Sequence, residues 1–378
     1  MRMELETLPD DILLRIFSFI DPFSLYRSLY PVNKRFRILC KRPVLWTSVD
    51  LTSFRVIENI INRMMDANLL GRHTRHLRLS AKIICSDDVQ EGLPAWEDLL
   101  RPVLKICDQL ESLYIHCGRF GHFSSFCAIL PATLRKMTFK CVCIKQNDVD
   151  PVGEMNLEFK NLESLTLTGC PWFTPVHLNR LVKPRPSKRL VYLNLSGCRG
   201  FFSRNDGDVI GHMVRIFEEV CPDLKYLGLG TVIRDDIVSL SQRVQGIQHL
   251  FESTPLLEVV DLSRSFHPEE NPLNPDQATA AIIKQLFYPH RLSGRVKPCV
   301  TLGLLGWSKD WVCSFMNSAS KILDSQSTLL LVVDHTVSDL TAGVRVKLVT
   351  WPKRHLKFED LMELSRTTDS REMYVDEK

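Results

Sequence analysis

The stretch LPDDILLRIFSFIDPFSLYRSLYPVNKRFRILCKRPVLWTSVDL, residues 8–51, decides how this chain begins to fold. Its prolines divide it into parts, because Pro9 suits the first position of a helix, the pair Asp21-Pro22 breaks that helix and Pro31 ends a second. Within each part, apolar side chains recur at helical spacing. The stretch therefore predicts three short helices, the second over residues 23–30 and the third carrying Val32, Phe36 and Leu39 on one side.

These three helices carry more apolar side chain than so short a segment can bury by itself. The first helix alone has six apolar side chains at helical spacing: Leu8, Ile12, Leu13, Ile16, Phe17 and Ile20. The pair Leu45-Trp46 then closes the stretch with a large apolar anchor. A small segment of this composition usually needs a partner surface.

The same string resembles the F-box, the motif that docks onto the Skp-type adaptor of cullin-based ubiquitin ligases. The resemblance covers roughly residues 6–50 and depends on the joint order of its elements: Leu8-Pro9 with an acidic pair, Ile16-Phe17, Val32 before Lys34-Arg35-Phe36, and Leu45-Trp46. Asn33 stands where that family often has Ser or Cys. The alternative is an ordinary helical cap on the domain that follows.

The resemblance and the excess apolar surface together predict which residues bind the adaptor. The predicted adaptor-binding residues are Leu8, Pro9, Ile12, Ile16, Phe17, Val32 and Phe36. Val32 and Phe36 are expected to be shared between contact and internal packing. We expect this N-terminal segment, and not the rest of the chain, to bind the adaptor.

The bulk composition bounds the class of protein. The chain has 378 residues, 44% of them hydrophobic and 24% charged, which is typical of soluble globular proteins long enough for more than one domain. A net charge of +4 is too small to imply nucleic acid, and no apolar run approaches the length of a membrane span. The N-terminus is not a secretory signal, so twelve cysteines are expected as reduced thiols in a cytoplasmic or nuclear protein.

From about residue 74 a strand signature recurs, leucine-x-x-apolar-x-leucine. Its copies are Leu110-Leu113-Ile115, Leu134-Met137-Phe139, Leu162-Leu165-Leu167, Leu190-Leu193-Leu195, Leu224-Leu227-Leu229 and Leu257-Val260-Leu262, after a degenerate copy at Thr74-Leu77-Leu79. Two copies end alike in Gly169-Cys170 and Gly197-Cys198, which predicts two buried thiols at equivalent positions that are not bonded to each other. This pattern looks like the cysteine-containing leucine-rich repeats that often follow an F-box.

The intervening segments are expected to form helices. Residues 96–107 and 209–220 carry apolar stripes at helical spacing, and Thr174-Pro175 is a suitable cap for a short helix with Leu178 and Leu181. After residue 262 the pattern fades into a Pro-rich insertion near 264–276, and a helix is expected over 278–288. Further strands are predicted around Leu302, over 329–333 and over 344–348, before a closing helix near 358–364.

The expected fold class is therefore α/β, a leucine-rich-repeat solenoid preceded by a small all-α three-helix F-box. The expected domains are the F-box at 6–51, the solenoid at 52–305, degenerate last repeats with a closing helix at 306–365, and a flexible polar tail at 366–378. The number of repeats after residue 262 stays open.

No pattern in the sequence predicts catalytic, cofactor-binding or metal-binding residues. Phosphate-binding, nucleophile-elbow and zinc-protease motifs are missing, and Cys141 with Cys143 forms a C-x-C without a second pair at zinc spacing. The basic run 183–189 is either a solvated loop or a nuclear signal. We expect a non-catalytic chain that needs no cofactor.

The predicted function is the substrate-recognition subunit of a Skp–cullin–F-box ubiquitin ligase, which reaches cullin and RING subunits through the adaptor. The alternative is a non-catalytic scaffold acting without ubiquitin transfer. Because side chains between the leucines of a strand point to the opposite face, that face is the predicted site for an unknown protein substrate. The predicted contacts are Tyr114, Tyr192, Tyr226, Asn194 and Arg78, with tyrosines as anchors.

Overall fold

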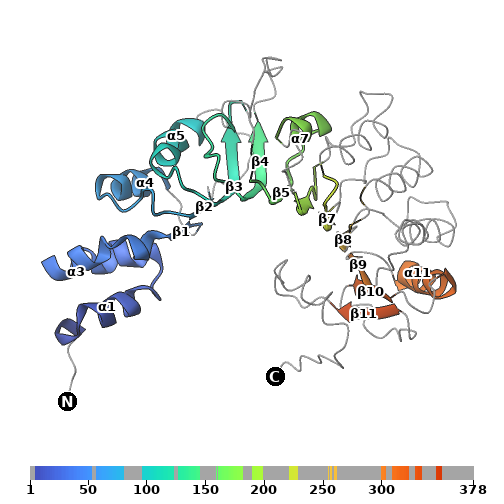
Figure 1. Ribbon diagram of the computed structural model, residues 1–378, viewed down its shortest axis with the longest axis horizontal. Helices are drawn as coiled ribbons and strands as arrows, with labels where there is room; N and C mark the ends of the chain where they lie inside the picture. Colours follow the sequence, from blue (N-terminus) through green and yellow to red (C-terminus); the bar gives the residue numbers. More distant parts are fainter. Residues whose placement is uncertain are drawn as a thin grey trace. The chain divides into compact units, whose positions relative to one another are not determined.

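The computed structural model describes residues 5–52, 57–80, 96–122, 127–144, 159, 161–181, 190–198, 221–228, 254, 256–257, 259–261, 299–303, 309–322, 328–333 and 346–350 (Figure 1). The chain divides into two compact units. The first comprises Met1–Trp172 with Arg180–Lys188, and the second Phe173–Asn179 with Arg189–Lys378. Several predictions fall outside the described residues: the basic run 183–189, the helices at 209–220, 278–288 and 358–364, the insertion at 264–276 and the tail at 366–378.

The first unit begins with short helical elements separated at the predicted breaks. They are η1 (Leu5–Thr7), α1 (Asp10–Phe17), α2 (Pro22–Ser24), the π-helical turn η2 (Leu25–Leu29), α3 (Lys34–Cys40) and η3 (Pro43–Trp46). The boundaries follow from side-chain caps. Asp21 Oδ1 accepts hydrogen bonds from the backbone N–H of Phe23 (3.1 Å) and Ser24 (2.9 Å), and Asn33 Oδ1 accepts one from Phe36 (2.7 Å). The third helix therefore starts at Lys34 behind an Asn33 cap, rather than at Val32.

These helices enclose a small core of their own. Its buried side chains are Leu13, Phe17, Leu25, Phe36, Leu39, Cys40, Leu45 and Trp46. The rings of Phe17 and Phe36 meet edge to face with centroids 5.3 Å apart, and Trp46 Nε1 donates to the carbonyl oxygen of Cys40 at 2.5 Å. Burial raises the pKa of the Cys40 thiol to about 11, so this cysteine packs as an apolar group.

A parallel sheet follows in the first unit, with strands in sequence order. The strands are β1 (Ser48–Leu51), β2 (His76–Ser80), β3 (Ser112–Phe120), β4 (Lys136–Ile144) and β5 (Ser164–Thr168). Their register stacks the signature residues into two buried rows: Val49, Leu77, Leu113, Met137 and Leu165, then Leu51, Leu79, Ile115, Phe139 and Leu167. The predicted strands are therefore present, with their leucines on the buried side.

Strand β1 was not predicted, because its residues were counted within the N-terminal helical segment. Trp46, Val49 and Leu51 nevertheless repeat the spacing of three and then two residues that marks the later strands. All three side chains are fully buried, and Val49 and Leu51 pair in register with Leu77 and Leu79 of β2. The N-terminal helices thus run directly into the first strand of the sheet.

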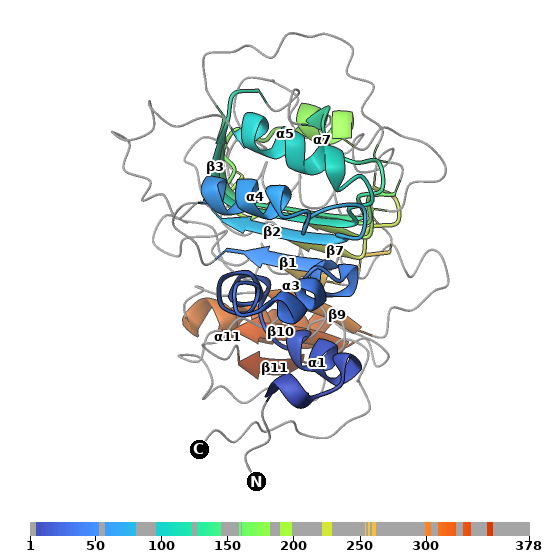
Figure 2. The same ribbon diagram turned by 90° about the vertical axis from the view of Figure 1, so that its left-hand side faces the viewer.

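Helices α4 (Ile57–Asp66) and α5 (Trp96–Ile106) lie on the same side of β2 and β3 (Figures 1 and 2). Helix α5 confirms the stripe predicted for residues 96–107, and it buries Leu100, Val103 and Leu104. Helix α4 was missed, although Ile61 and Met64 are buried three residues apart.

The second unit contains a further parallel array, again in sequence order. Its strands are β6 (Tyr192–Asn194), β7 (Tyr226–Gly228), β8 (Val259–Asp261), β9 (Cys299–Gly303), β10 (Thr328–Val333) and β11 (Val346–Thr350). The predicted short helix α7 (Pro175–Leu181) is present and buries Leu178 and Leu181; its residues up to Asn179 belong to the second unit, and its last two belong to the first. The sequence reading missed α11 (Lys309–Ile322), whose buried Val312, Phe315, Met316 and Ala319 follow helical spacing.

A short turn recurs at the first leucine of five copies of the strand signature. In each copy a backbone N–H donates to the carbonyl oxygen three residues earlier: Leu110 to Cys107, Leu134 to Pro131, Leu162 to Phe159, Leu224 to Cys221 and Leu257 to Thr254. Cys107 and Cys221 fill the same buried place in this turn, and burial raises the pKa of the Cys107 thiol to about 11. The cysteines that precede the leucines are therefore structural.

A left-handed backbone position recurs where strands end or bend. Its occupants are Cys117 (φ 52°) in β3, Cys141 (φ 51°) in β4, Gly169 (φ 64°) after β5 and Gly197 (φ 77°) after β6. This conformation explains the Gly-Cys endings, because glycine reaches it without a steric cost. The following cysteines, Cys170 and Cys198, are buried thiols that are not bonded to each other, as predicted.

We expect Gly169→Ala and Gly197→Ala each to lower the free energy of unfolding by about 1–2 kcal/mol, because a Cβ strains the left-handed backbone. Cys141→Gly should raise the free energy of unfolding by about 0.5–1 kcal/mol. Cys141→Ala, which keeps the Cβ, should leave the free energy of unfolding nearly unchanged. Urea denaturation of the four variants tests this. Equal stability of the Gly and Ala variants at position 141 would contradict the assignment.

Candidate functional site

The N-terminal helical segment exposes most of the large apolar side chains that the structure shows on the surface. Six of the seven large hydrophobic residues found exposed among the described residues lie between positions 5 and 44: Leu5, Ile12, Phe19, Val32, Ile38 and Val44. We call these six the N-terminal apolar surface. Phe19 is 84% exposed and Val44 67%, values that are costly unless a partner covers them.

Helix α1 has two apolar stripes rather than one. Leu13 and Phe17, four residues apart, are fully buried against the rest of the segment. Ile12, Ile16 and Phe19 follow at i, i+4 and i+7, which places them on a neighbouring stripe, and two of them are exposed. The turn that continues the stripe past the helix end is closed by Phe19 N–H donating to Ile16 O at 3.1 Å.

The predicted adaptor-binding residues separate into two groups on this basis. Pro9, Ile12 and Val32 are exposed, and Leu8 and Ile16 are partly exposed. Phe17 and Phe36 are 0% and 3% exposed and pack on each other. A side chain buried within its own segment has no surface to offer a partner. Phe17 and Phe36 are therefore core residues of the segment, and their prediction as contact residues is corrected.

Sequence reasoning missed Leu5, Phe19, Ile38 and Val44 as surface residues. The spacing from Ile12 and Ile16 would have found Phe19, since all three share one helical stripe. Ile38 stands between the buried Phe36 and Leu39 on α3, and only the direction of packing reveals it as exposed.

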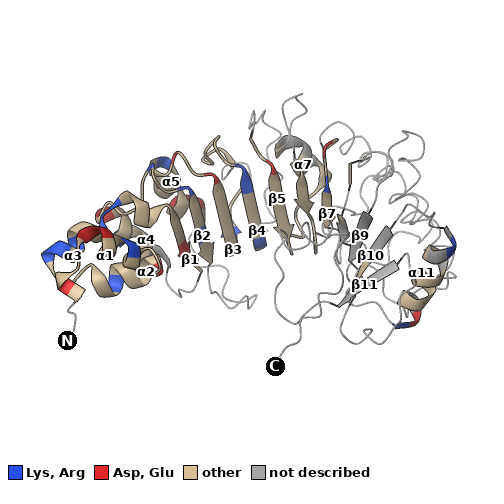
Figure 3. Cartoon of the chain, turned by 60° about the horizontal axis from the view of Figure 1, so that its bottom comes forward, with Lys and Arg blue, Asp and Glu red and all other residues tan. Residues whose placement is uncertain are grey.

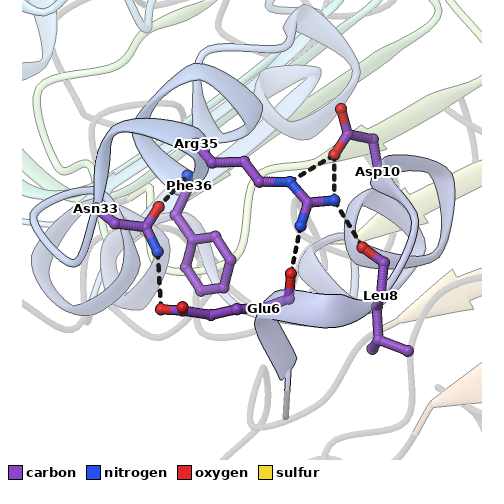
Figure 4. A network of polar contacts seen from close by, with 6 residues as sticks. All are labelled: Glu6, Leu8, Asp10, Asn33, Arg35 and Phe36. Atoms are coloured by element: carbon purple, nitrogen blue, oxygen red, sulfur yellow. Dashed lines mark hydrogen bonds and ion pairs between the residues drawn. The ribbon is translucent and has the colours of Figure 1, made fainter.

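A network around Arg35 fixes the start of the segment against α3 (Figure 4). Arg35 donates from Nη1 to Glu6 O (2.5 Å), from Nη2 to Leu8 O (2.6 Å), and from Nε to Asp10 Oδ1 (2.9 Å). Asn33 adds a bond from Nδ2 to Glu6 Oε1 at 3.0 Å. One guanidinium therefore holds residues 6–10, which include the exposed Pro9 and precede the exposed Ile12.

A polar cluster lies on the outward face of the first unit's sheet. Asp50, Arg78 and Tyr114 are consecutive in register across β1, β2 and β3. Arg78 Nε lies 3.3 Å from Asp50 Oδ2, and its guanidinium carbon lies 4.7 Å from the centre of the Tyr114 ring. Lys140 Nζ lies 5.8 Å from the same ring centre. Partial burial, opposed by the Arg78 charge, raises the pKa of Tyr114.

His116 borders this cluster, with Nδ1 3.0 Å from Ser80 Oγ and its ring centroid 6.5 Å from that of Tyr114. Burial and the positive charge of Lys140 both lower the pKa of His116 below its usual 6.5. The imidazole is therefore largely neutral at pH 7, and the charge of this face comes from Lys and Arg.

The predicted contacts in the second unit form a separate group. Tyr192 and Tyr226 stack with ring centroids 4.2 Å apart and planes at 11°. Tyr226 is only 4% exposed, because it packs between Tyr192 and Val259, so it is not available as an anchor. Asn194 Nδ2 lies 3.5 Å from Tyr192 Oη, and Asn194 Oδ1 accepts from Ser196 N–H at 2.9 Å. Of these three predicted contacts, Tyr192 and Asn194 remain partly exposed.

Within the described ranges, no three His, Cys, Asp or Glu side chains gather as metal ligands. No described helix is both long enough and apolar enough to cross a membrane.

Comparison with known proteins identifies the N-terminal segment alone. Residues 5–52 match the family model described as F-box-like, a range that covers all the N-terminal helical elements and β1. No curated protein matches the chain. The chain thus carries an F-box-like domain, followed by parallel strands and helices.

Proposed function

We propose that this chain is the substrate-recognition subunit of a Skp–cullin–F-box ubiquitin ligase, with its N-terminal apolar surface docked on a Skp-type adaptor. The single observation that carries the proposal is the coincidence of two ranges. The residues that match the F-box-like family, 5–52, also carry six exposed large apolar side chains around a formed core. Such a segment is suited to binding through a preorganised surface.

We further propose that the parallel strands after the F-box-like domain are leucine-rich repeats forming a solenoid, and that their outward face binds the substrate. The recurring spacing of buried leucines, the recurring turn and the parallel order support this assignment. Each such unit buries its apolar side against its neighbours and leaves the opposite face for a partner.

In this proposal the chain performs no covalent step. The adaptor fixes the chain to cullin and RING subunits. A bound substrate is then held near a conjugating enzyme that carries ubiquitin, in the cytosol or the nucleus. The raised local concentration, rather than a side chain of this protein, accelerates transfer. No cofactor is required for that role.

Affinity purification of the full-length chain from cells tests the proposal. Recovery of a Skp-type adaptor together with a cullin is the expected result, and it should be lost when residues 5–46 are removed. Recovery of other partners without adaptor or cullin would instead identify a scaffold that acts without ubiquitin transfer.

Arg35→Ala is expected to weaken adaptor binding about fivefold, because it releases residues 6–10 from α3 without removing an apolar contact. Amide hydrogen exchange should accelerate at residues 6–8, while the melting temperature changes little. Lys34→Ala, an exposed neighbour on the same helix, serves as the matched control. If Arg35→Ala frees those amides yet binds the adaptor normally, their positioning is irrelevant to docking.

A further inference from the structure

The outward face of β1–β5, opposite the buried leucines, carries more basic than acidic side chains. Up to the left-handed residues Cys117 and Cys141, the charged outward residues are Asp50, Arg78, Lys136 and Lys140. Three basic residues and one carboxylate thus lie on this face of the described strands. Figure 3 shows the basic positions on β4 in blue and the acidic one on β1 in red.

The one carboxylate of this face is already engaged. Asp50 Oδ2 pairs with Arg78, and Oδ1 accepts from both the backbone N–H (2.9 Å) and the hydroxyl (2.7 Å) of Thr52. Lys140 lies over Tyr114 and pairs with none of the carboxylates that the structure describes. Lys140 therefore offers a positive charge to a ligand that binds on this face.

Tyr114 is prepared as an anchor by the same arrangement. Arg78 and Lys140 both lie within 6 Å of its ring centre, and the residue is partly buried on a strand paired on both sides. A large ring held in place loses little freedom when a partner packs on it, which favours binding.

The spacing of the basic residues favours one kind of ligand. The backbones of Arg78 and Lys140 stand two strands apart and two residues out of register, about 12 Å, and those of Lys136 and Lys140 stand four residues apart along β4, about 13 Å. A single phosphate needs donors that converge on one point. An extended chain with acidic side chains at every second residue repeats at about 7 Å and reaches dispersed charges instead.

We propose that the outward face of β2–β4 binds an extended, Asp/Glu-rich segment of a partner protein, with carboxylates meeting Arg78, Lys136 and Lys140 and with Tyr114 as the central anchor. The inference rests on the proposed role of these strands as the substrate-binding part. It names the chemistry of that partner and assigns the binding to β2–β4, where Tyr114 and Arg78 lie.

Fluorescence polarisation with the full-length chain tests this inference. The probe is a labelled peptide of about twelve residues in which Glu alternates with Ser, long enough to cross the face. It should bind at least tenfold more tightly than the same peptide with Gln for Glu. Its affinity should fall several-fold as salt rises from about 50 to about 300 mM.

Substitutions locate the site. Lys140→Gln and Arg78→Gln together should weaken the Glu peptide about tenfold, whereas Lys105→Gln, an exposed lysine on α5, should not. Lys140→Glu should gain affinity for the peptide with Lys in place of Glu, a reversal that a merely destabilised fold cannot produce. Equal binding of the Glu and Gln peptides would overturn the proposal. Tenfold tighter binding of the peptide with phosphoserine for Ser would also overturn it, in favour of a phosphate site.

Adaptor capture by the same variants separates this inference from the proposed function. It should stay unchanged, because the substitutions lie outside residues 5–52. Failure of the wild-type chain to capture adaptor would count against the ligase role alone. Loss of the Glu preference with normal adaptor capture would count against the acidic partner alone.

Discussion

Replacing Ile12, Phe19 and Val32 together by serine is expected to weaken capture of a Skp-type adaptor by about a hundredfold or more. Each of these side chains is 46–84% exposed in the free chain and would be covered in the complex. Burial of a large apolar side chain contributes about 1.5–3 kcal/mol, and three partial losses add to about 3–5 kcal/mol. Surface plasmon resonance with purified adaptor measures the change.

The fold should survive this triple replacement, because none of the three side chains belongs to the buried core. The melting temperature is therefore expected to shift little, and circular dichroism should be unchanged. Leu256→Ser, another exposed apolar position, is the matched control outside the F-box-like domain. Undiminished capture by the folded triple variant would place the adaptor contact elsewhere on the chain.

Phe17→Ala is expected to lower the free energy of unfolding of the F-box-like domain by about 3–5 kcal/mol. A loss of that size is enough to unfold a domain of marginal stability. Phe17 is fully buried and its ring packs edge to face on Phe36, so truncation leaves a cavity and removes an aromatic pair. Thermal denaturation followed by near-ultraviolet circular dichroism reports the loss.

Phe19→Ala provides a matched comparison two residues away. The same side chain is removed, but from a position that is 84% exposed, so stability should change by less than about 0.5 kcal/mol. Adaptor binding should fall in this variant although its fold is intact. Comparable destabilisation by both substitutions would show that the division of α1 into a buried and an exposed stripe is wrong.

Proline and its neighbours made the helical elements of the N-terminal segment predictable. Pro22 and Pro31 restrict the backbone wherever they stand, so the breaks could be predicted without knowledge of the fold. The precise starts depended on Asp21 and Asn33, whose side chains bond to nearby backbone N–H groups. These capping bonds are local, and the types of residue would have allowed them to be predicted too.

The contact residues of the same segment could be predicted only in part. Periodicity identifies apolar stripes on a helix, but α1 has two adjacent stripes, Leu13 with Phe17 and Ile12 with Phe19. Which of them is buried depends on where α3 lies, and that is a property of packing. The sequence therefore predicted Ile12 correctly as a surface residue but misplaced Phe17 and overlooked Phe19.

The sheet face shows the same division. Strand alternation correctly predicted that Arg78 and Tyr114 face outward together, because the two-residue period is a property of the extended backbone. It could not predict that Tyr226 is buried, since that depends on the stacked ring of Tyr192 and on the neighbouring Val259. Exposure is decided by neighbours that are distant in sequence.

By itself, the sequence determined the three helical pieces at the N-terminus and the strands marked by leucine spacing, because these depend on local backbone preference and periodicity. The F-box-like identity of residues 5–52 also came from the sequence, through its resemblance to that family. Only the tertiary structure decided that Trp46, Val49 and Leu51 open the sheet, that Arg35 fixes residues 6–10 and that Arg78 and Lys140 lie over the ring of Tyr114. The reason is physical: each of these depends on the register of parallel strands or the docking of one helix on another, which brings together groups that are 25 or more residues apart.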